Sequence, residues 1–215
     1  MLVDDTTNIY VGETQIEKIY NGEISLYEKN PGYTKLNYIQ TTGLQYLNTN
    51  YYPTYKTDYE IDMELTMPVS KSWQQIVAST MYNTADVKLF CASEVDNNVR
   101  AQIYDVPSTV VIMGSNNGRI KIRTEGSNIY YNDEFYYDLG RTRVGTETNP
   151  IWIASAPQQT NLTTAMKIYG FKMWEDGVLI RNYIPVLDSN NVPCLYDKVN
   201  KNYLYNAGRS VFLYG

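Results

Sequence analysis

The 215-residue chain contains no histidine. This absence excludes Ser-His-Asp and Cys-His activation of a nucleophile, general-base chemistry by histidine, and metal sites with histidine ligands. Cysteine is scarce as well: Cys91 and Cys194 are far apart and form no Cys-x-x-Cys pair, which disfavours a metal or redox role. We expect two buried free thiols, with a single disulfide between them as the alternative.

Long apolar runs and runs of Lys or Arg are also missing. The apolar stretches are far shorter than a membrane-spanning helix, and the opening MLVDDTTNIY is polar from Asp4 onward, so we expect neither a membrane span nor a signal peptide. The net charge is −5, and an acidic chain without a basic run is poorly suited to a phosphate backbone. We therefore expect a soluble protein made in a cytoplasm, with no nucleic acid and no membrane as partner.

Tyrosine is abundant, with 22 residues against 4 phenylalanines. Its large rigid ring with a polar tip suits binding surfaces and the half-exposed faces of sheets. No segment has the i, i+3, i+4, i+7 apolar spacing of an amphipathic helix. Residues 59–66 instead alternate apolar and polar side chains, which predicts a strand with one buried and one solvated face.

Short strands separated by turn residues continue through the rest of the chain. Four more are expected, within residues 86–93, 108–114, 119–126 and 150–156. The tetrapeptide SNNG at 115–118 predicts a hairpin turn, and Asp176-Gly177 predicts a hairpin between two long strands within residues 166–186. This pattern is typical of an antiparallel β-sandwich or jelly roll.

The N-terminal part of the chain contains a repeat. IYVGETQI starts at Ile9 and IYNGEISL at Ile19, and the two segments share Ile, Tyr, Gly and Glu at matching positions. A unit this short cannot bury a face alone, so we expect the pair to form one small hairpin that adds to a neighbouring sheet or packs against symmetry mates. A hairpin folded back on its own sandwich is the alternative.

A Pro-Gly dipeptide within residues 29–33 predicts a break after this repeat. We therefore divide the chain into three parts: a hairpin at 1–29, a linker at 30–33 and one main domain at 34–215.

Both ends of the main domain resemble a known family. YTKLNYIQTTGLQYLNTNYYP at 33–53, YGFKMWEDGVLIRNYIPV at 169–186 and PCLYDKVNKNYLYNAGRSVF at 193–212 are similar to the first and last strands of concanavalin A-like (laminin G-like) jelly-roll domains of tailed phages and gut-bacterial surface proteins. Residues 70–160 match no motif of that family. The resemblance implies an all-β, antiparallel jelly-roll sandwich, and it implies turn-holding roles for Asp197 and Asn206.

The repeat resembles Ile-Tyr-x-Gly units that recur in tandem in phage tail, fibre and other virion proteins. This resemblance implies an attachment segment that contacts other capsid or tail proteins and builds a homo-oligomer, with a trimer as a plausible symmetric form. The positions that carry it are Ile9, Tyr10, Gly12, Ile19, Tyr20 and Gly22.

Together the two resemblances imply a virion protein made in the bacterial host cytoplasm: a head fibre, a decoration protein or a tail appendage. Its lectin-like domain would bind host-surface or mucus glycans weakly and multivalently. A purely structural decoration protein without sugar binding is the alternative.

Sugar binding needs aromatic faces together with Asn or Asp side chains that pair with hydroxyl groups. Three places offer such side chains, and each is also compatible with an ordinary turn or sheet edge: Trp73; Asp96, Asn97 and Asn98; and Tyr130, Tyr131, Asn132 and Asp133. Trp152 and Trp174 lie within strands and are expected in the core. Oxygen-rich loops are compatible with Ca²⁺, but no EF-hand spacing is present, so we expect no metal site and no cofactor.

The segment EIDME raises the possibility of a glycoside hydrolase. Laminarinase-type glycosidases share the jelly-roll fold and carry Glu-x-Asp-x-x-Glu or Glu-x-Asp-x-Glu on one strand, so Glu60 would be the nucleophile and Glu64 the acid/base, with Asp62 on the same strand face. The simpler interpretation is the solvated face of an outer strand, because those enzymes place their motif later in the chain among tryptophans. We expect a binding protein and not an enzyme.

Overall fold

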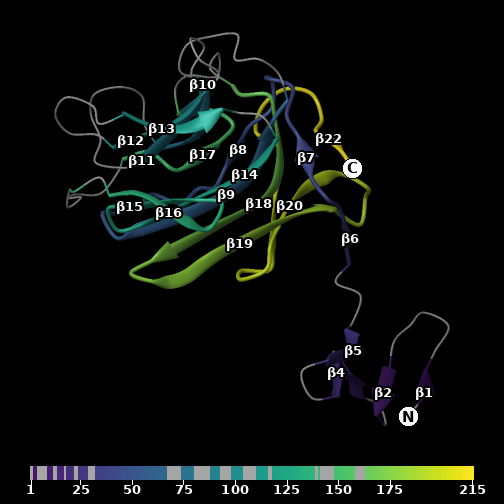
Figure 1. Ribbon diagram of the computed structural model, residues 1–215. Coiled ribbons are helices and arrows are strands. Elements are labelled where there is room, and N and C mark those ends of the chain that lie inside the picture. Colours follow the sequence, from purple (N-terminus) through teal and green to yellow (C-terminus); the bar gives the residue numbers. More distant parts are fainter. Residues whose placement is uncertain are drawn as a thin grey trace.

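The computed structural model describes most of the chain beyond residue 31 and short strands before it. The described residues are 2–3, 9–11, 14–16, 18–21, 24–28, 32–66, 74–79, 88–92, 98–103, 110–115, 118–138, 140, 148–157 and 163–215. All the regular elements in these ranges are β-strands (Figure 1). The expected all-β class is therefore confirmed.

Two antiparallel sheets form the body of the fold (Figure 1). The smaller sheet has six strands in the order β13-β12-β11-β10-β17-β8. Their bounds are Val110–Ser115 (β13), Asn98–Ile103 (β12), Lys88–Ala92 (β11), Gln74–Ala78 (β10), Trp152–Ile153 (β17) and Leu47–Asn48 (β8).

The larger sheet has eleven strands, and its main path runs β16-β15-β14-β9-β18-β19-β20-β21. These strands are Glu134–Asp138 (β16), Asn128–Tyr131 (β15), Arg119–Glu125 (β14), Thr57–Leu65 (β9), Met166–Glu175 (β18), Val178–Leu187 (β19), Pro193–Asp197 (β20) and Asn202–Leu204 (β21). Three short strands complete it: β6 (Thr34–Lys35) on β19, β7 (Ile39–Gln40) on β18, and β22 (Leu213–Tyr214) on β7.

The apolar core lies between the two sheets. Tyr59, Ile61 and Met63 of β9 are fully buried, as are Ile76 and Ile153 of the small sheet, and all five belong to one cluster. The polar residues that alternate with them along β9 point to the opposite, outer face of the large sheet. The alternation predicted for residues 59–66 is therefore confirmed.

One of the two predicted hairpins is confirmed and the other is wrong. β18 and β19 are joined by Asp176 and Gly177, both at positive φ (52° and 78°), as a two-residue turn between right-twisted strands requires. The segment SNNG instead follows β13 of the small sheet and leads into β14 of the large sheet, and these strands pair with other partners. Turn residues mark a change of direction but do not specify which strands it joins.

The two tryptophans expected in the core are only partly buried. Trp152 lies between the buried residues Ile151 and Ile153, so strand alternation turns its ring to the outer face, where it stacks on Tyr46 at 4.5 Å between ring centroids. Trp174 follows the buried Met173 on β18, so the same alternation takes its ring out of the buried row.

Cys194 of β20 is buried and free, as expected for a structural thiol. Burial raises the pKa of this thiol to about 12, which makes it unreactive. Cys91 lies in β11, and its side chain is outside the described part of the structure.

The N-terminal repeat forms two hairpins and not the single one expected. β2 (Ile9–Val11) pairs with β3 (Thr14–Ile16), and β4 (Lys18–Asn21) pairs with β5 (Ile24–Glu28), so each repeat unit has its own strand pair. β1 (Leu2–Val3) adds to β2. Among the described residues these five strands pair only with one another, and Figure 1 shows them apart from the two large sheets.

The turn-holding roles expected for Asp197 and Asn206 are visible in their hydrogen bonds. The Oδ1 atom of Asp197 accepts hydrogen bonds from the backbone N–H groups of Asn182 and Val199, both at 3.0 Å, and its carboxylate is fully buried. The Oδ1 atom of Asn206 accepts from the N–H groups of Tyr46 at 3.2 Å and Gly208 at 2.8 Å. Both side chains therefore fix segments that are distant in sequence.

We expect Asp197→Ala to lower the free energy of unfolding by about 3 kcal/mol, because it leaves two backbone donors without their acceptor. Chemical denaturation of the full chain measures this loss. Glu134 is exposed on edge strand β16, so Glu134→Ala serves as the control and should change stability by less than about 0.5 kcal/mol. A similar effect of the two substitutions would contradict the turn-holding role.

Candidate functional site

The outer face of the large sheet carries three adjacent rows of charged side chains. The acidic row on β9 lies between basic rows on β14 and β18, and its members are Glu60, Asp62 and Glu64. In the strand register, Glu60 lies opposite Arg123 and Lys172, and Glu64 opposite Arg119 and Lys167. Each acid therefore has a cation within reach on a neighbouring strand.

Each of these acids is held by a specific partner. Asp62 accepts two hydrogen bonds from the Arg119 guanidinium, at 2.7 Å to Nε and 2.7 Å to Nη2. Glu60 pairs with Lys172 at 2.9 Å. Glu64 accepts from the Tyr169 hydroxyl at 2.7 Å and from Lys167 at 3.1 Å.

These contacts disfavour the glycosidase interpretation. The hydrogen bond from Tyr169 and the one from Lys167 lower the pKa of Glu64 below its ordinary value of 4.5. A glycosidase acid/base must instead carry a raised pKa, because it has to be protonated when the bond breaks. The arrangement fits the alternative that the sequence analysis favoured, an ion-paired outer strand face.

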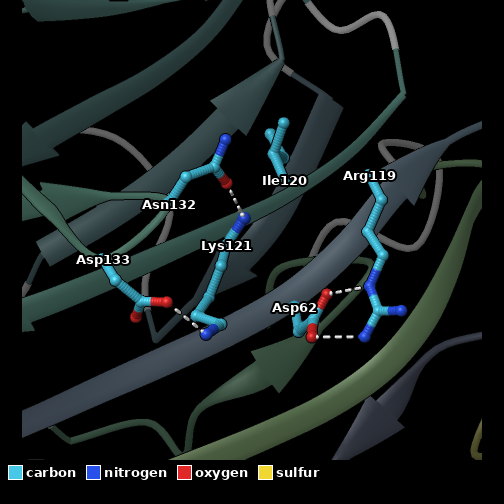
Figure 2. Close-up of a pocket in the computed structure, with 6 residues that line it drawn as sticks. All are labelled: Asp62, Arg119, Ile120, Lys121, Asn132 and Asp133. Carbon is cyan, nitrogen blue, oxygen red and sulfur yellow. Dashed lines mark hydrogen bonds and ion pairs between the residues drawn. The ribbon is translucent and has the colours of Figure 1, made fainter.

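A polar cavity of about 310 Å³ opens on this face, and Figure 2 shows the side chains around it. It is lined by Asp62, Arg119, Ile120, Lys121, Asn132 and Asp133. Two ion pairs cross it: the bidentate Asp62–Arg119 pair and the pair between Lys121 Nζ and Asp133 Oδ2 at 2.7 Å. The cavity therefore combines fixed donors and acceptors of both charges on a rigid sheet.

The turn between β15 and β16 supplies one wall of this cavity. Asn132 and Asp133 both have positive φ, 50° and 69°, as in a two-residue hairpin turn. The side-chain Oδ1 atom of Asn132 accepts a hydrogen bond from the backbone N–H of Lys121 at 2.8 Å, and the backbone N–H of Asn132 donates to the Lys121 carbonyl at 2.8 Å. The side-chain Nδ2 atom of Asn132 makes no hydrogen bond to any described residue, so it is available to a ligand.

A second cavity, of about 480 Å³, adjoins the first because Arg119 lines both. Its remaining wall comes from the start of the sandwich, from β18 and from β19: Lys35, Leu36, Asn37, Tyr38, Tyr169, Ile184 and Pro185. The Arg119 guanidinium lies over the Tyr169 ring at 4.0 Å, and Lys167 Nζ lies 5.1 Å from the centre of the Tyr38 ring. Arg119 is thus common to both cavities, and we refer to the two cavities together as the groove.

The structure brings some of the sequence-predicted residues together and leaves others apart. Asn132 and Asp133 line the first cavity with Asp62. Tyr130 lies on β15 beside it, and Arg123 stacks on the Tyr130 ring at 4.0 Å. Tyr131 instead packs against the apolar core, and its ring lies 6.1 Å from that of Tyr136.

Other predicted residues cannot be placed in the site. Trp73, Asp96, Asn97, Gly12 and Gly22 lie outside the described residues, and so do the side chains of Asn98, Ile9, Tyr10, Ile19 and Tyr20. These predictions are not tested by the structure.

We did not predict the basic and aromatic members of the groove from the sequence. Arg119 and Lys121 alternate with the buried residues Ile120 and Ile122 on β14, so strand alternation alone would have placed them on the outer face. Tyr169 lies close to a bulge between Ile168 and Gly170, where the register shifts and simple alternation no longer predicts the direction of a side chain.

No group of three or more Cys, Asp or Glu side chains in the described part of the chain is arranged to hold a metal ion. Within the same ranges, no helix is long and apolar enough to cross a membrane.

Comparison with known proteins gives a likeness of fold only. No family model and no curated protein matches the chain. A crystal structure from Bacteroides ovatus ATCC 8483, provisionally described as that of a carbohydrate-binding protein, is similar with a TM-score of 0.54 and 10% sequence identity. The match covers 84% of this chain and 60% of that one, so this chain spans less than two thirds of its structural neighbour. At this identity the likeness supports the antiparallel β-sandwich and says nothing of individual site residues.

Proposed function

We propose that this protein binds carbohydrate in the groove formed by the two cavities. The observation that carries the proposal is the polar cavity of Figure 2, in which ion pairs hold donors and acceptors in place before any ligand arrives. A sugar presents many hydroxyl groups, each both donor and acceptor, and a wall of carboxylate, amide, guanidinium and ammonium groups matches it. Because the site is already ordered, binding costs little conformational entropy.

The neighbouring aromatic rings complete the chemistry that a sugar needs. Tyr38 and Tyr169 line the adjoining cavity and offer ring surface against which the C–H face of a pyranose can stack. The similar structure from Bacteroides ovatus is provisionally described as a carbohydrate-binding protein, which supports the same class of ligand.

We further propose that the protein is a virion component and that the N-terminal hairpins attach it. Two observations support this part: the Ile-Tyr-x-Gly repeat, and the five strands that pair only with one another among the described residues. Edge strands of such small sheets have unpaired N–H and C=O groups that can join strands of other subunits. Several copies on one particle would convert weak single-site binding into useful avidity.

Asn132→Gly is expected to weaken glycan binding by about tenfold, because it removes both polar atoms of the side chain while glycine accepts the positive φ of the turn. Titration calorimetry with glycans selected from a bacterial and mucin panel measures the change in Kd. Asn191→Gly is the matched control, since Asn191 is an exposed turn residue with φ of 60° on another hairpin. Equal losses in both variants, or no loss in Asn132→Gly, would place the sugar elsewhere.

We expect binding without cleavage. Neither the wild-type chain nor Glu64→Gln should release reducing ends from the glycans that the wild-type chain retains, because Glu64 is ionised at neutral pH and cannot donate a proton. A reducing-sugar assay over hours, with a commercial glycosidase as positive control, measures this. Release by the wild-type chain that Glu64→Gln abolishes would instead establish the hydrolase.

Deletion of residues 1–31 is expected to leave single-site affinity and the melting temperature unchanged, because β1–β5 make no strand pair with the sandwich. The same deletion should abolish the oligomer and weaken retention on a glycan-coated surface by about 10² or more through lost avidity. Analytical ultracentrifugation and surface plasmon resonance measure the two effects. A truncated chain with the oligomeric state of the full chain would contradict the attachment role.

The virion location itself is tested by immunogold labelling of purified phage particles.

A further inference from the structure

The two cavities of the groove differ in charge. Asp62 and Asp133 offset Arg119 and Lys121 in the first cavity, so its lining is balanced. The second cavity is lined by Lys35 and Arg119 and by no carboxylate side chain. Arg119 is already paired with Asp62 of the first cavity, so Lys35 is the cation that gives the second cavity its positive charge.

Lys35 is a cation without a fixed partner. It lies on β6, the two-residue strand that pairs with Val186 and Leu187 of β19, and it is exposed. Among the described residues, no carboxylate forms an ion pair or a hydrogen bond with its ammonium group. A surface lysine with this freedom can turn toward an incoming anion at little cost.

Arg119 is a cation whose position is already fixed. Its Nε and Nη2 atoms bind Asp62, and its plane lies over the Tyr169 ring at 4.0 Å. A guanidinium has five N–H donors, and this geometry uses two of them. The remaining N–H groups lie along an edge of the guanidinium that can donate two parallel hydrogen bonds to a carboxylate or sulfate.

The rest of the cavity is suited to the body of a ring. Leu36 and Ile184 are partly buried, Pro185 is buried, and the Tyr38 and Tyr169 rings lie on the same wall. This wall is held by backbone hydrogen bonds, from Leu36 N–H to the Pro185 carbonyl at 3.0 Å and from Tyr38 N–H to the Gly215 carbonyl at 3.1 Å. Cations thus lie beside an apolar, aromatic surface.

We infer that the second cavity binds the anionic group of an acidic glycan, a polymer with uronate or other carboxylate-bearing sugars. Lys35 and the free edge of Arg119 would contact the carboxylate, and the Tyr38–Tyr169 wall would contact the sugar ring. This inference rests on the proposed function and adds a preference for charge to it. The overall negative charge of the chain opposes non-specific attraction to polyanions, so such a preference requires a local site.

Polygalacturonate and hyaluronan, each compared with its carboxyl-reduced neutral form, test the inference on the full chain. We expect the acidic polymers to bind about tenfold more tightly than the neutral forms at low salt, and the difference to shrink as salt increases. Lys35→Gln should remove most of the difference between the acidic and neutral forms, and Lys35→Arg should retain it. Lys198→Gln, at an exposed lysine outside both cavities, is the control.

The outcomes separate this inference from the proposed function. Equal binding of acidic and neutral forms, lost in Asn132→Gly, keeps the proposed function and overturns the preference for acidic sugars. An acidic preference that survives in Lys35→Gln and Lys35→Arg alike overturns its assignment to this cavity. Absence of binding to any glycan in the wider panel overturns the proposed function and, with it, the inference.

Discussion

The structure depends on the two-sided alternation of β9, the strand that lies between β14 and β18 in the large sheet. Its inner residues, Tyr59, Ile61 and Met63, are completely buried and join the two sheets. Its outer residues are acids, and acids packed side by side on one strand face require cations on the flanking strands. The same strand therefore determines both where the core lies and where the groove's charged groups gather.

These ion pairs matter more for geometry than for stability. Arg119 and Asp62 retain 56% and 20% of their side-chain exposure, and pairs so open to water contribute little to the free energy of unfolding. Their effect is to hold the guanidinium and the carboxylate in one arrangement, which the aromatic contact with Tyr169 reinforces. A binding surface that is ordered in this way does not have to be ordered by its ligand.

The chain combines two kinds of β-structure with different capacities for burial. The large sheets enclose an apolar cluster, whereas each N-terminal hairpin has too few strands to do so. In the proposed function, identical copies of the chain or other virion proteins supply the partners that stabilise such a small sheet. In the proposed function, one part of the chain supplies attachment and the other supplies a weak, multivalent contact.

The sequence by itself determined the all-β class, the inward and outward rows of β9, the Asp176-Gly177 hairpin and the turn-holding role of Asp197, because each follows from local periodicity or from a motif. The sequence also indicated Asn132 and Asp133, because turn residues with free polar groups can be recognised from the sequence alone. Only the tertiary structure decided that the segment SNNG leads from one sheet to the other, that each repeat unit forms its own hairpin, and that Arg119 lies between two cavities with Tyr38 and Tyr169. All three depend on which strands lie next to each other. That is determined by the burial of core residues that are distant in sequence, so local patterns do not reveal it.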